Sequence, residues 1–162
     1  MSFKPTLQDF HAKALSDYGI DDIWPEPVLK AAKIASEKLT QDKDYLEEFP
    51  FVTIDGEDAK DFDDAIFCTF NDDGFHLKVA IADVSFFVRE HSALDLEAGK
   101  RTTSVYMPKK VVPMLPERLS NELCSLQPNK RRRCLCVEIN FDKDGHITNY
   151  KFHRGIIKSV AR

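Results

Sequence analysis

The sequence predicts an α+β fold in which a mixed, largely antiparallel sheet is flanked by helices. Two turn signals between β-rich runs support this prediction: Asn71-Asp-Asp-Gly74 between residues 65–70 and 75–82, and Asp142-Lys-Asp-Gly145 between residues 133–141 and 147–157. Each arrangement is typical of an antiparallel hairpin. Hairpin signals outnumber strand-helix-strand alternation, so we expect antiparallel pairing to dominate.

The chain divides into a helical lead-in at residues 1–48 and a β-rich body at residues 49–162. In the lead-in, Thr6 stands before a set of apolar positions and Gly19 follows them, which gives the cap and the stop of a short amphipathic helix. Apolar spacing from Val28 onward predicts a second helix. We expect the whole lead-in to be peripheral.

The body begins with a short β-rich run at residues 51–54. After the first hairpin, residues 92–100 predict a helix, residues 108–116 a proline-bounded crossing loop, and residues 120–126 a helical turn. The final strand runs to the end of the chain without a stop signal. We therefore expect this chain to be a fragment of a longer protein.

Composition places the chain among folded proteins. It has 162 residues, of which 43% are hydrophobic and 31% are charged, close to the average for soluble domains. Its apolar runs are far shorter than the roughly 20 residues that cross a bilayer, and its N-terminus lacks the features of a secretory signal. We expect a cytoplasmic protein without a membrane partner.

The four cysteines lie in apolar contexts, and we interpret them as reduced core thiols: Cys68, Cys124, Cys134 and Cys136. A zinc site would require further ligands, and the nearest histidines, His146 and His153, fall outside recognised zinc spacings.

Charge is unevenly distributed along the chain. The net charge is −4, but residues 1–99 hold 9 Lys and Arg against 22 Asp and Glu, whereas residues 100–133 hold 9 against 2. An enzyme that cuts a polyanion needs carboxylates for metal and cations for phosphates. Solvated faces give similar statistics, so the asymmetry alone is weak support.

The densest negative charge lies at residues 55–64, here called the acidic loop, which carries −5 in ten residues. Carboxylates this close raise one another's pKa and destabilise a fold unless solvent or a cation relieves them. A solvated loop is the simpler interpretation. Three features favour a metal site instead: apolar strands bracket the loop, Phe62 lies within it, and most of its acids are Asp, whose short side chains suit rigid oxygen coordination.

The spacing of residues in the acidic loop argues against a calcium site and favours a magnesium site. A helix-loop-helix calcium site needs Gly at its sixth position and Glu at its twelfth, but counting from Asp55 these positions hold Lys60 and Ile66. Magnesium binds through fewer protein ligands and completes its shell with water and phosphate oxygens. Carboxylates at an open cleft therefore favour metal-assisted phosphodiester chemistry.

The acidic loop and three later blocks resemble the ribonuclease II and ribonuclease R family. The sequence Asp-Gly-Glu-Asp-Ala within the loop is more similar to the ribonuclease R branch. The blocks follow in the family's order: Thr53–Ala65, Val79–Ser85, Thr103–Pro108, and Pro113–Pro116 through Leu119–Leu126. The resemblance runs from about Phe51 to Arg162. It implies that residues 49–162 form the N-terminal part of an RNB-type catalytic domain.

The family resemblance implies hydrolysis of RNA from its 3′ end to nucleoside 5′-monophosphates, with Mg²⁺ as cofactor and Mn²⁺ as the alternative. It places four aspartates on the catalytic, metal-binding positions, with Asp63 the most critical: Asp55, Asp61, Asp63 and Asp64. Glu57 and Asp58 fall on none of these positions, and we interpret them as structural.

Tyr106 falls on the family's aromatic that packs against the terminal nucleotide of single-stranded RNA. From its residue context alone it would be interpreted as a core aromatic. The basic residues Lys109, Lys110 and Lys130–Arg133 are candidates for phosphate contacts, although such runs usually face solvent.

Complete members of the family carry flanking oligonucleotide-binding barrels and a second half of the catalytic domain, which supplies an arginine, a carboxylate and an aromatic clamp. We therefore expect this chain to be weakly active or inactive alone. The alternative is a non-catalytic RNA- or metal-binding module derived from such a domain.

Overall fold

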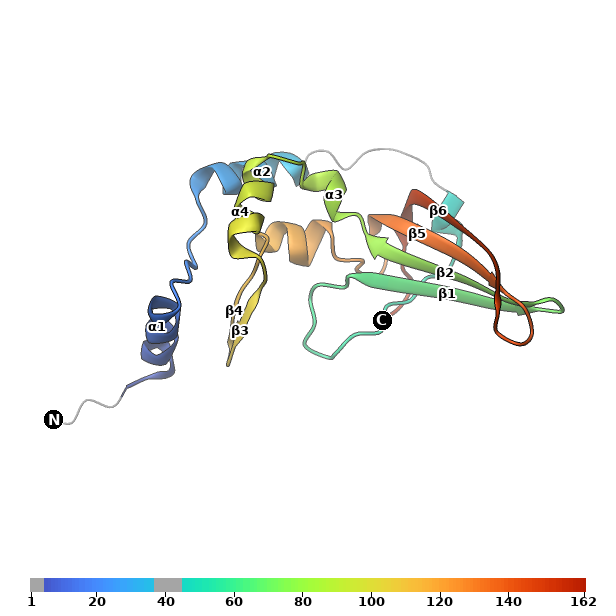
Figure 1. Cartoon of the computed structure of the whole chain (residues 1–162), viewed down its shortest axis with the longest axis horizontal. Coiled ribbons are helices and arrows are strands. Elements are labelled where there is room, and N and C mark those ends of the chain that lie inside the picture. Colours follow the sequence, from blue (N-terminus) through green and yellow to red (C-terminus); the bar gives the residue numbers. More distant parts are fainter. Residues whose placement is uncertain (1–4, 37–44) are drawn as a thin grey trace.

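A four-stranded antiparallel sheet forms the body of the protein, in the order β1-β2-β5-β6 (Figure 1). The computed structural model describes residues 5–36 and 45–162. Its sheet strands are β1 (Asp64–Asn71), β2 (Gly74–Ala82), β5 (Arg131–Phe141) and β6 (Ile147–Lys158). Both expected hairpins and the antiparallel α+β class are confirmed.

The β1–β2 turn requires glycine at Gly74. Its φ is +140°, and a Cβ atom there would lie 2.1 Å from the carbonyl oxygen of Phe141. The Asn71 side chain closes the same turn by accepting hydrogen bonds from the backbone N–H groups of Asp73 and Gly74. Local turn chemistry and packing against β5 therefore select the same residues.

Most helices and a two-stranded ribbon lie toward one end of the sheet, the two hairpin turns lie at the other, and η1 lies beside β6 (Figure 1). In chain order the remaining elements are α1 (Leu7–Asp17), α2 (Glu26–Ser36), the 3₁₀ turn η1 (Tyr45–Glu48), α3 (Val84–Phe87), α4 (Ala93–Arg101), β3 (Val105–Met107), β4 (Lys110–Val112) and the π-helical turn η2 (Arg118–Leu123). Within the described ranges no helix is long and apolar enough to cross a membrane.

The lead-in is only partly peripheral. The cap at Thr6 is confirmed: Thr6 and Asp9 exchange hydrogen bonds as a capping box, and α1 lies at the edge of the molecule. Helix α2 corrects the prediction, because Val28, Ala32 and Ala35 are buried in the main core and α2 packs against α4 and η2. The expected continuation of the second helix to Leu39 lies outside the described residues.

Two predicted segments of the body differ from the structure. Residues 51–54 form no strand, because only Val52 pairs, in isolated bridges with Ile66 and Ala161. Residues 108–116 are not simply a crossing loop, because their start forms β4 and closes a ribbon with β3. The left-handed conformation of Lys109, with φ +59°, allows the tight reversal between these strands.

The two faces of the sheet have different surroundings. Ala80 and Cys136, which pair across β2 and β5, are fully buried, and η1 packs against the neighbouring strand β6. On the opposite face Phe75 and Tyr150 are exposed. Cys68 is also exposed, which corrects its assignment to the core, whereas the other three thiols are buried as predicted.

Candidate metal centre and nucleic-acid interface

The acidic loop joins the bridge at Val52 to the start of β1, and its apolar residue is buried. Phe62 is 6% exposed and belongs to the main hydrophobic core. Asp61 before it is half-buried, and Asp63 and Asp64 after it are exposed. Neighbouring residues of an extended chain point to opposite sides. Burial of Phe62 therefore directs Asp61 and Asp63 away from the core.

Backbone hydrogen bonds fix the C-terminal half of the acidic loop. The Phe62 N–H donates to the hydroxyl oxygen of Ser125 at 3.1 Å, and the Phe62 carbonyl accepts from the N–H of Leu126 at 2.8 Å. One residue later, the Asp63 carbonyl accepts from the N–H of Ala82 at 2.8 Å. This half of the loop is therefore anchored both to the segment after η2 and to the sheet, as expected from the apolar strands on either side of it.

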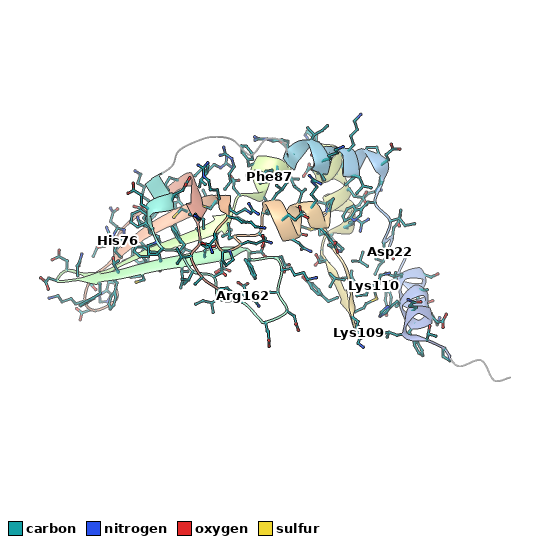
Figure 2. All side chains as sticks on the ribbon, turned by 180° about the vertical axis from the view of Figure 1, so that it is seen from behind. Asp22, His76, Phe87, Lys109, Lys110 and Arg162 are labelled. Carbon is teal, nitrogen blue, oxygen red and sulfur yellow. The ribbon has the colours of Figure 1, made fainter. Side chains whose placement is uncertain are left out.

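Arg162 holds the N-terminal half. Its guanidinium donates to the carbonyl of Gly56 and lies over the Phe62 ring, 5.2 Å from the ring centroid. Figure 2 shows Arg162 beside this loop. The backbone supports the contact, since the Thr53 N–H donates to the carbonyl of Ala161 at 3.2 Å. Nothing in the local sequence had marked Arg162 as a partner of the acidic loop.

The four candidate aspartates are electrostatically coupled. Partial burial of the Asp63 carboxyl raises its pKa above the usual range, and the charges of Asp61, Asp55 and Asp64 raise it further. An Asp55 carboxylate oxygen, Oδ2, is buried and has no hydrogen-bond partner among the described residues. A buried, unpaired carboxylate oxygen is costly unless a cation or a proton relieves it.

These aspartates fit a hard divalent cation by chemistry but do not form a closed cage. All four donors are carboxylate oxygens, the type that Mg²⁺ and Mn²⁺ prefer. They do not bring three oxygens within 4.8 Å of one another. Mutual repulsion between unneutralised carboxylates favours such a spread. Glu57 and Asp58 are exposed, and their interpretation as structural residues stays a prediction.

The negative potential of the loop extends into the core beneath it. Burial raises the pKa of the Cys124 thiol to about 12, and the charges of Asp63 and Asp83 contribute. Arg132 opposes this effect on Cys124, while burial lowers the pKa of Arg132 itself. The Cys124 thiol is therefore held in its neutral form, and Arg132 is a buried cation next to it.

Tyr106 lies on the β3–β4 ribbon with its side chain 71% exposed, opposite Val111 in the strand register. An exposed ring has a free face for base stacking, so its interpretation as a core aromatic is excluded. Figure 2 shows Lys109 and Lys110 on the same ribbon beside α1. Lys110 forms an ion pair with Asp22 at 2.5 Å, so of these two lysines it is the one already engaged within the fold.

The run Lys130–Arg133 does not form a solvent-facing basic patch. Arg131 pairs with Glu47, Arg132 is buried, and the Arg133 guanidinium lies 3.9 Å from the Phe86 ring centroid. Alternation along β5 explains the difference, because successive residues of a strand face opposite sides. Its candidacy for phosphate contacts is weakened accordingly.

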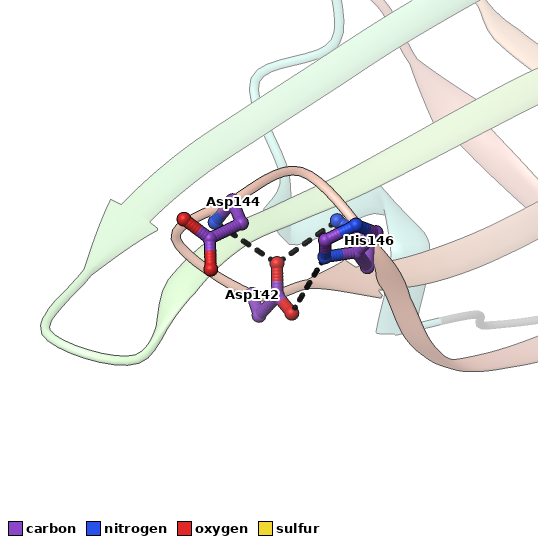
Figure 3. Close-up of side chains that lie close together, drawn as sticks. All are labelled: Asp142, Asp144 and His146. Atoms are coloured by element: carbon purple, nitrogen blue, oxygen red, sulfur yellow. Dashed lines mark hydrogen bonds and ion pairs between the residues drawn. The ribbon is translucent and has the colours of Figure 1, made fainter.

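A second acidic cluster lies in the β5–β6 turn, defined as residues 142–146 (Figure 3). Asp142, Asp144 and His146 are the only group of three within the described ranges whose possible ligand atoms lie within 4.8 Å of one another. Asp142 Oδ1 accepts from the N–H groups of Asp144 and His146, and Oδ2 lies 3.2 Å from His146 Nδ1. These bonds close the turn and account for the cluster without an ion.

Sequence and structure comparisons identify the family. The RNB domain family matches residues 43–162. The chain is 48% identical over 153 residues to a ribonuclease R of Acidithiobacillus ferrooxidans, covering 92% of this chain and 35% of that relative.

Solved structures agree with that match. Mycoplasma genitalium RNase R in its apo form has a TM-score of 0.85 and 38% identity, covering 96% of this chain and 25% of that one. The same enzyme in complex with double-stranded RNA also has a TM-score of 0.85, with 36% identity over 96% of this chain and 28% of that one. This chain, which spans about a third or less of these relatives, therefore belongs to the RNB domain family.

Proposed function

We propose that this chain is the metal-binding part of a 3′-to-5′ exoribonuclease that releases nucleoside 5′-monophosphates. The observation that carries the proposal is the unrelieved negative charge of the acidic loop. The Asp63 pKa is raised, and the buried Asp55 Oδ2 has no partner in the part of the chain that the structure describes. In a member of the RNB family, a divalent cation is the simplest relief for that charge.

The ligands in this proposal are Asp55, Asp61, Asp63 and Asp64, with Mg²⁺ as the physiological ion and Mn²⁺ as a substitute. When bound, such an ion supplies charge neutralisation at a phosphate and a water of lowered pKa. Asp61 and Asp63 flank the buried Phe62 and point to the opposite side, toward solvent, so a phosphate can reach their carboxylates. The Arg162 contact holds the entry of the loop in place.

The RNA contact in this proposal is Tyr106. Its exposed ring offers a π-face on which an unpaired base can stack, which favours a single-stranded 3′ end over a duplex. A base inside a duplex has both faces already stacked, whereas an unpaired base can turn a face toward the ring. The neighbouring Lys109, which is exposed at the ribbon turn, adds a positive charge suited to a phosphate.

We further propose that this chain cleaves RNA weakly or not at all by itself. Phosphate cleavage depends strongly on positive charge placed where the transition state develops negative charge. The guanidinium nearest to the acidic loop, that of Arg162, is already bonded to the Gly56 carbonyl and lies over Phe62. Stabilisation of the phosphate would therefore come from other parts of a family-length protein.

The test has two stages. First, calorimetric titration of the chain with Mn²⁺ and Mg²⁺ should show binding that Asp63→Asn abolishes. Second, the gene product that carries this chain should degrade a 3′-tailed RNA with Mg²⁺, and Asp63→Asn should abolish cleavage. Metal binding without cleavage by the gene product would support a non-catalytic module instead. Cleavage that survives Asp63→Asn would refute the catalytic assignment.

A further inference from the structure

We infer that Ser125 is a positioning residue for the proposed metal centre, whose hydroxyl sets the backbone that carries Asp61 and Asp63. This inference rests on the proposed function. Ser125 follows η2 and is 0% exposed. Its hydroxyl donates to the Lys60 carbonyl at 2.7 Å and accepts from the Phe62 N–H at 3.1 Å. One buried side chain thus bridges the two backbone groups on either side of Asp61.

The bridge controls the direction of two carboxylates. The Lys60 carbonyl and the Phe62 N–H belong to the peptide groups that flank Asp61, so fixing both restricts the Asp61 backbone. The Leu126 N–H bonds the Phe62 carbonyl at 2.8 Å, which fixes the next peptide as well and with it the start of Asp63. Repulsion among the aspartates tends to spread the loop, and these hydrogen bonds oppose that spreading.

Arg132 in turn fixes Ser125. The buried Arg132 guanidinium donates from Nε to the Ser125 carbonyl at 2.9 Å and from a terminal nitrogen to the Arg131 carbonyl at 3.0 Å. The Ser125 carbonyl also accepts from the N–H of Gln127 at 2.8 Å. Strand β5 therefore holds Ser125, and Ser125 holds the acidic loop. A hydrogen bond to a charged donor is worth more than a neutral one, which strengthens this connection.

The chain offers a matched control in Ser159. It is 1% exposed, and its hydroxyl donates to the Leu126 carbonyl at 2.7 Å, so it contacts the segment beside Ser125. Its carbonyl accepts from the N–H of Asn129 at 2.7 Å, and neither Leu126 nor Asn129 belongs to the acidic loop. Ser125→Ala and Ser159→Ala each delete one buried hydroxyl. Ser125→Ala breaks two hydrogen bonds and Ser159→Ala breaks one, so the loss of thermal stability should be somewhat larger for Ser125→Ala.

The experiment is Mn²⁺ titration of the whole chain, with thermal unfolding of each variant. We expect Ser125→Ala to weaken Mn²⁺ binding about 10-fold, the lower end of the range for groups that orient metal ligands. Ser159→Ala should stay within about twofold of the unmodified chain, because it leaves the loop anchored. Amide exchange at Phe62 should accelerate in Ser125→Ala and remain slow in Ser159→Ala.

The outcomes separate this inference from the proposed function. If Asp63→Asn abolishes Mn²⁺ binding but Ser125→Ala and Ser159→Ala bind Mn²⁺ with equal affinity, Ser125 is only structural. That result overturns this inference and leaves the proposed function standing. If the unmodified chain binds no Mn²⁺, the proposed function and this inference both fall. If Ser125→Ala does not fold, Ser125→Cys decides, because it nearly preserves volume and weakens both hydrogen bonds. Unchanged Mn²⁺ affinity in Ser125→Cys would overturn the inference.

Discussion

The acidic loop and the β5–β6 turn both gather carboxylates in a short segment, but their carboxylates have different partners. In the β5–β6 turn, the Asp142 carboxylate accepts backbone and side-chain hydrogen bonds, chiefly from His146, and its pKa is lowered. In the acidic loop, partial burial and three like charges raise the pKa of Asp63. The turn satisfies its own charge, whereas the loop does not.

The difference shows why spatial convergence alone is a poor guide to a metal site. The three possible ligand atoms of the β5–β6 turn are closer together than those of the acidic loop. Their closeness arises from hydrogen bonds that shape the turn and occupy the same oxygens an ion would need. The acidic loop instead keeps a buried Asp55 oxygen without a partner. Unsatisfied charge on an anchored backbone is the more informative property.

The largest expected effect is the loss of metal binding on removing one carboxylate from the acidic loop. Asp63→Asn should weaken Mn²⁺ binding by at least about 100-fold, above the range for groups that only support a ligand. Asp144→Asn, in the β5–β6 turn, should leave the affinity unchanged. Calorimetry of both variants checks this. Equal losses would show that the two segments do not differ as described.

The next effect concerns RNA rather than metal. Tyr106→Ala should weaken binding of a short single-stranded RNA by about 1–3 kcal/mol, the worth of one stacked base, and Tyr106→Phe should restore it. Tyr150 is a suitable control because it is 63% exposed but lies on the sheet. Fluorescence anisotropy with labelled RNA measures both. If Tyr150→Ala weakens binding as much as Tyr106→Ala, stacking is not specific to the ribbon.

A smaller effect is expected on the stability of the β5–β6 turn. Asp142→Ala should lower the thermal midpoint by about 2–4 °C, because it removes acceptors that close the turn. The Asp142 pKa is lowered in the folded state, so its stabilisation is complete above the usual carboxyl range. It is lost as pH falls through the lowered pKa. The difference in thermal midpoint between Asp142→Ala and the unmodified chain should therefore be larger at pH 7 than at pH 2.5.

The smallest expected effect is a gain in folding stability, whereas the preceding substitutions cause losses of affinity or stability. A raised Asp63 pKa means that the folded chain binds a proton more tightly than the unfolded chain, so ionised Asp63 destabilises the metal-free fold at neutral pH. Asp63→Asn should therefore stabilise the metal-free chain at pH 7 by less than about 1 kcal/mol, since solvent screens a carboxylate that is only partly buried.

Carboxyl NMR titration checks the cause of that effect. Asp61→Asn should lower the Asp63 pKa toward its usual value, because it removes one of the three neighbouring charges. A normal Asp63 pKa in the unmodified chain would contradict the difference between the two acidic segments.

Much of the sheet could be predicted from local signals. Asn71 and Gly74 specify the first hairpin through side-chain hydrogen bonds and a φ that other residues avoid, so neighbouring residues carry the information. Cys68 shows the limit of that approach. Its apolar neighbours predicted burial, but whether a strand face is covered depends on segments distant in sequence.

The candidate site also has a part that local sequence predicted and a part that it did not. The acidic loop and its four aspartates were evident from composition and motif, and Tyr106 from the family resemblance. The anchors were not predicted, because Ser125 and Arg162 contact the loop across separations of 63 residues, for Phe62, and 106 residues, for Gly56. Ser125 lies in one of the blocks that resemble the family, but the resemblance did not predict its contact with the acidic loop.

The sequence by itself determined the family, the hairpins and the placing of unusual negative charge in residues 55–64, since motif, turn chemistry and charge density are local properties. Only the tertiary structure decided which acidic residues remain unsatisfied, that Arg132 lies buried beneath them, and that Ser125 bridges the peptides around Asp61. The reason is physical. Burial and hydrogen-bond partnership depend on which distant segments the folded chain brings together.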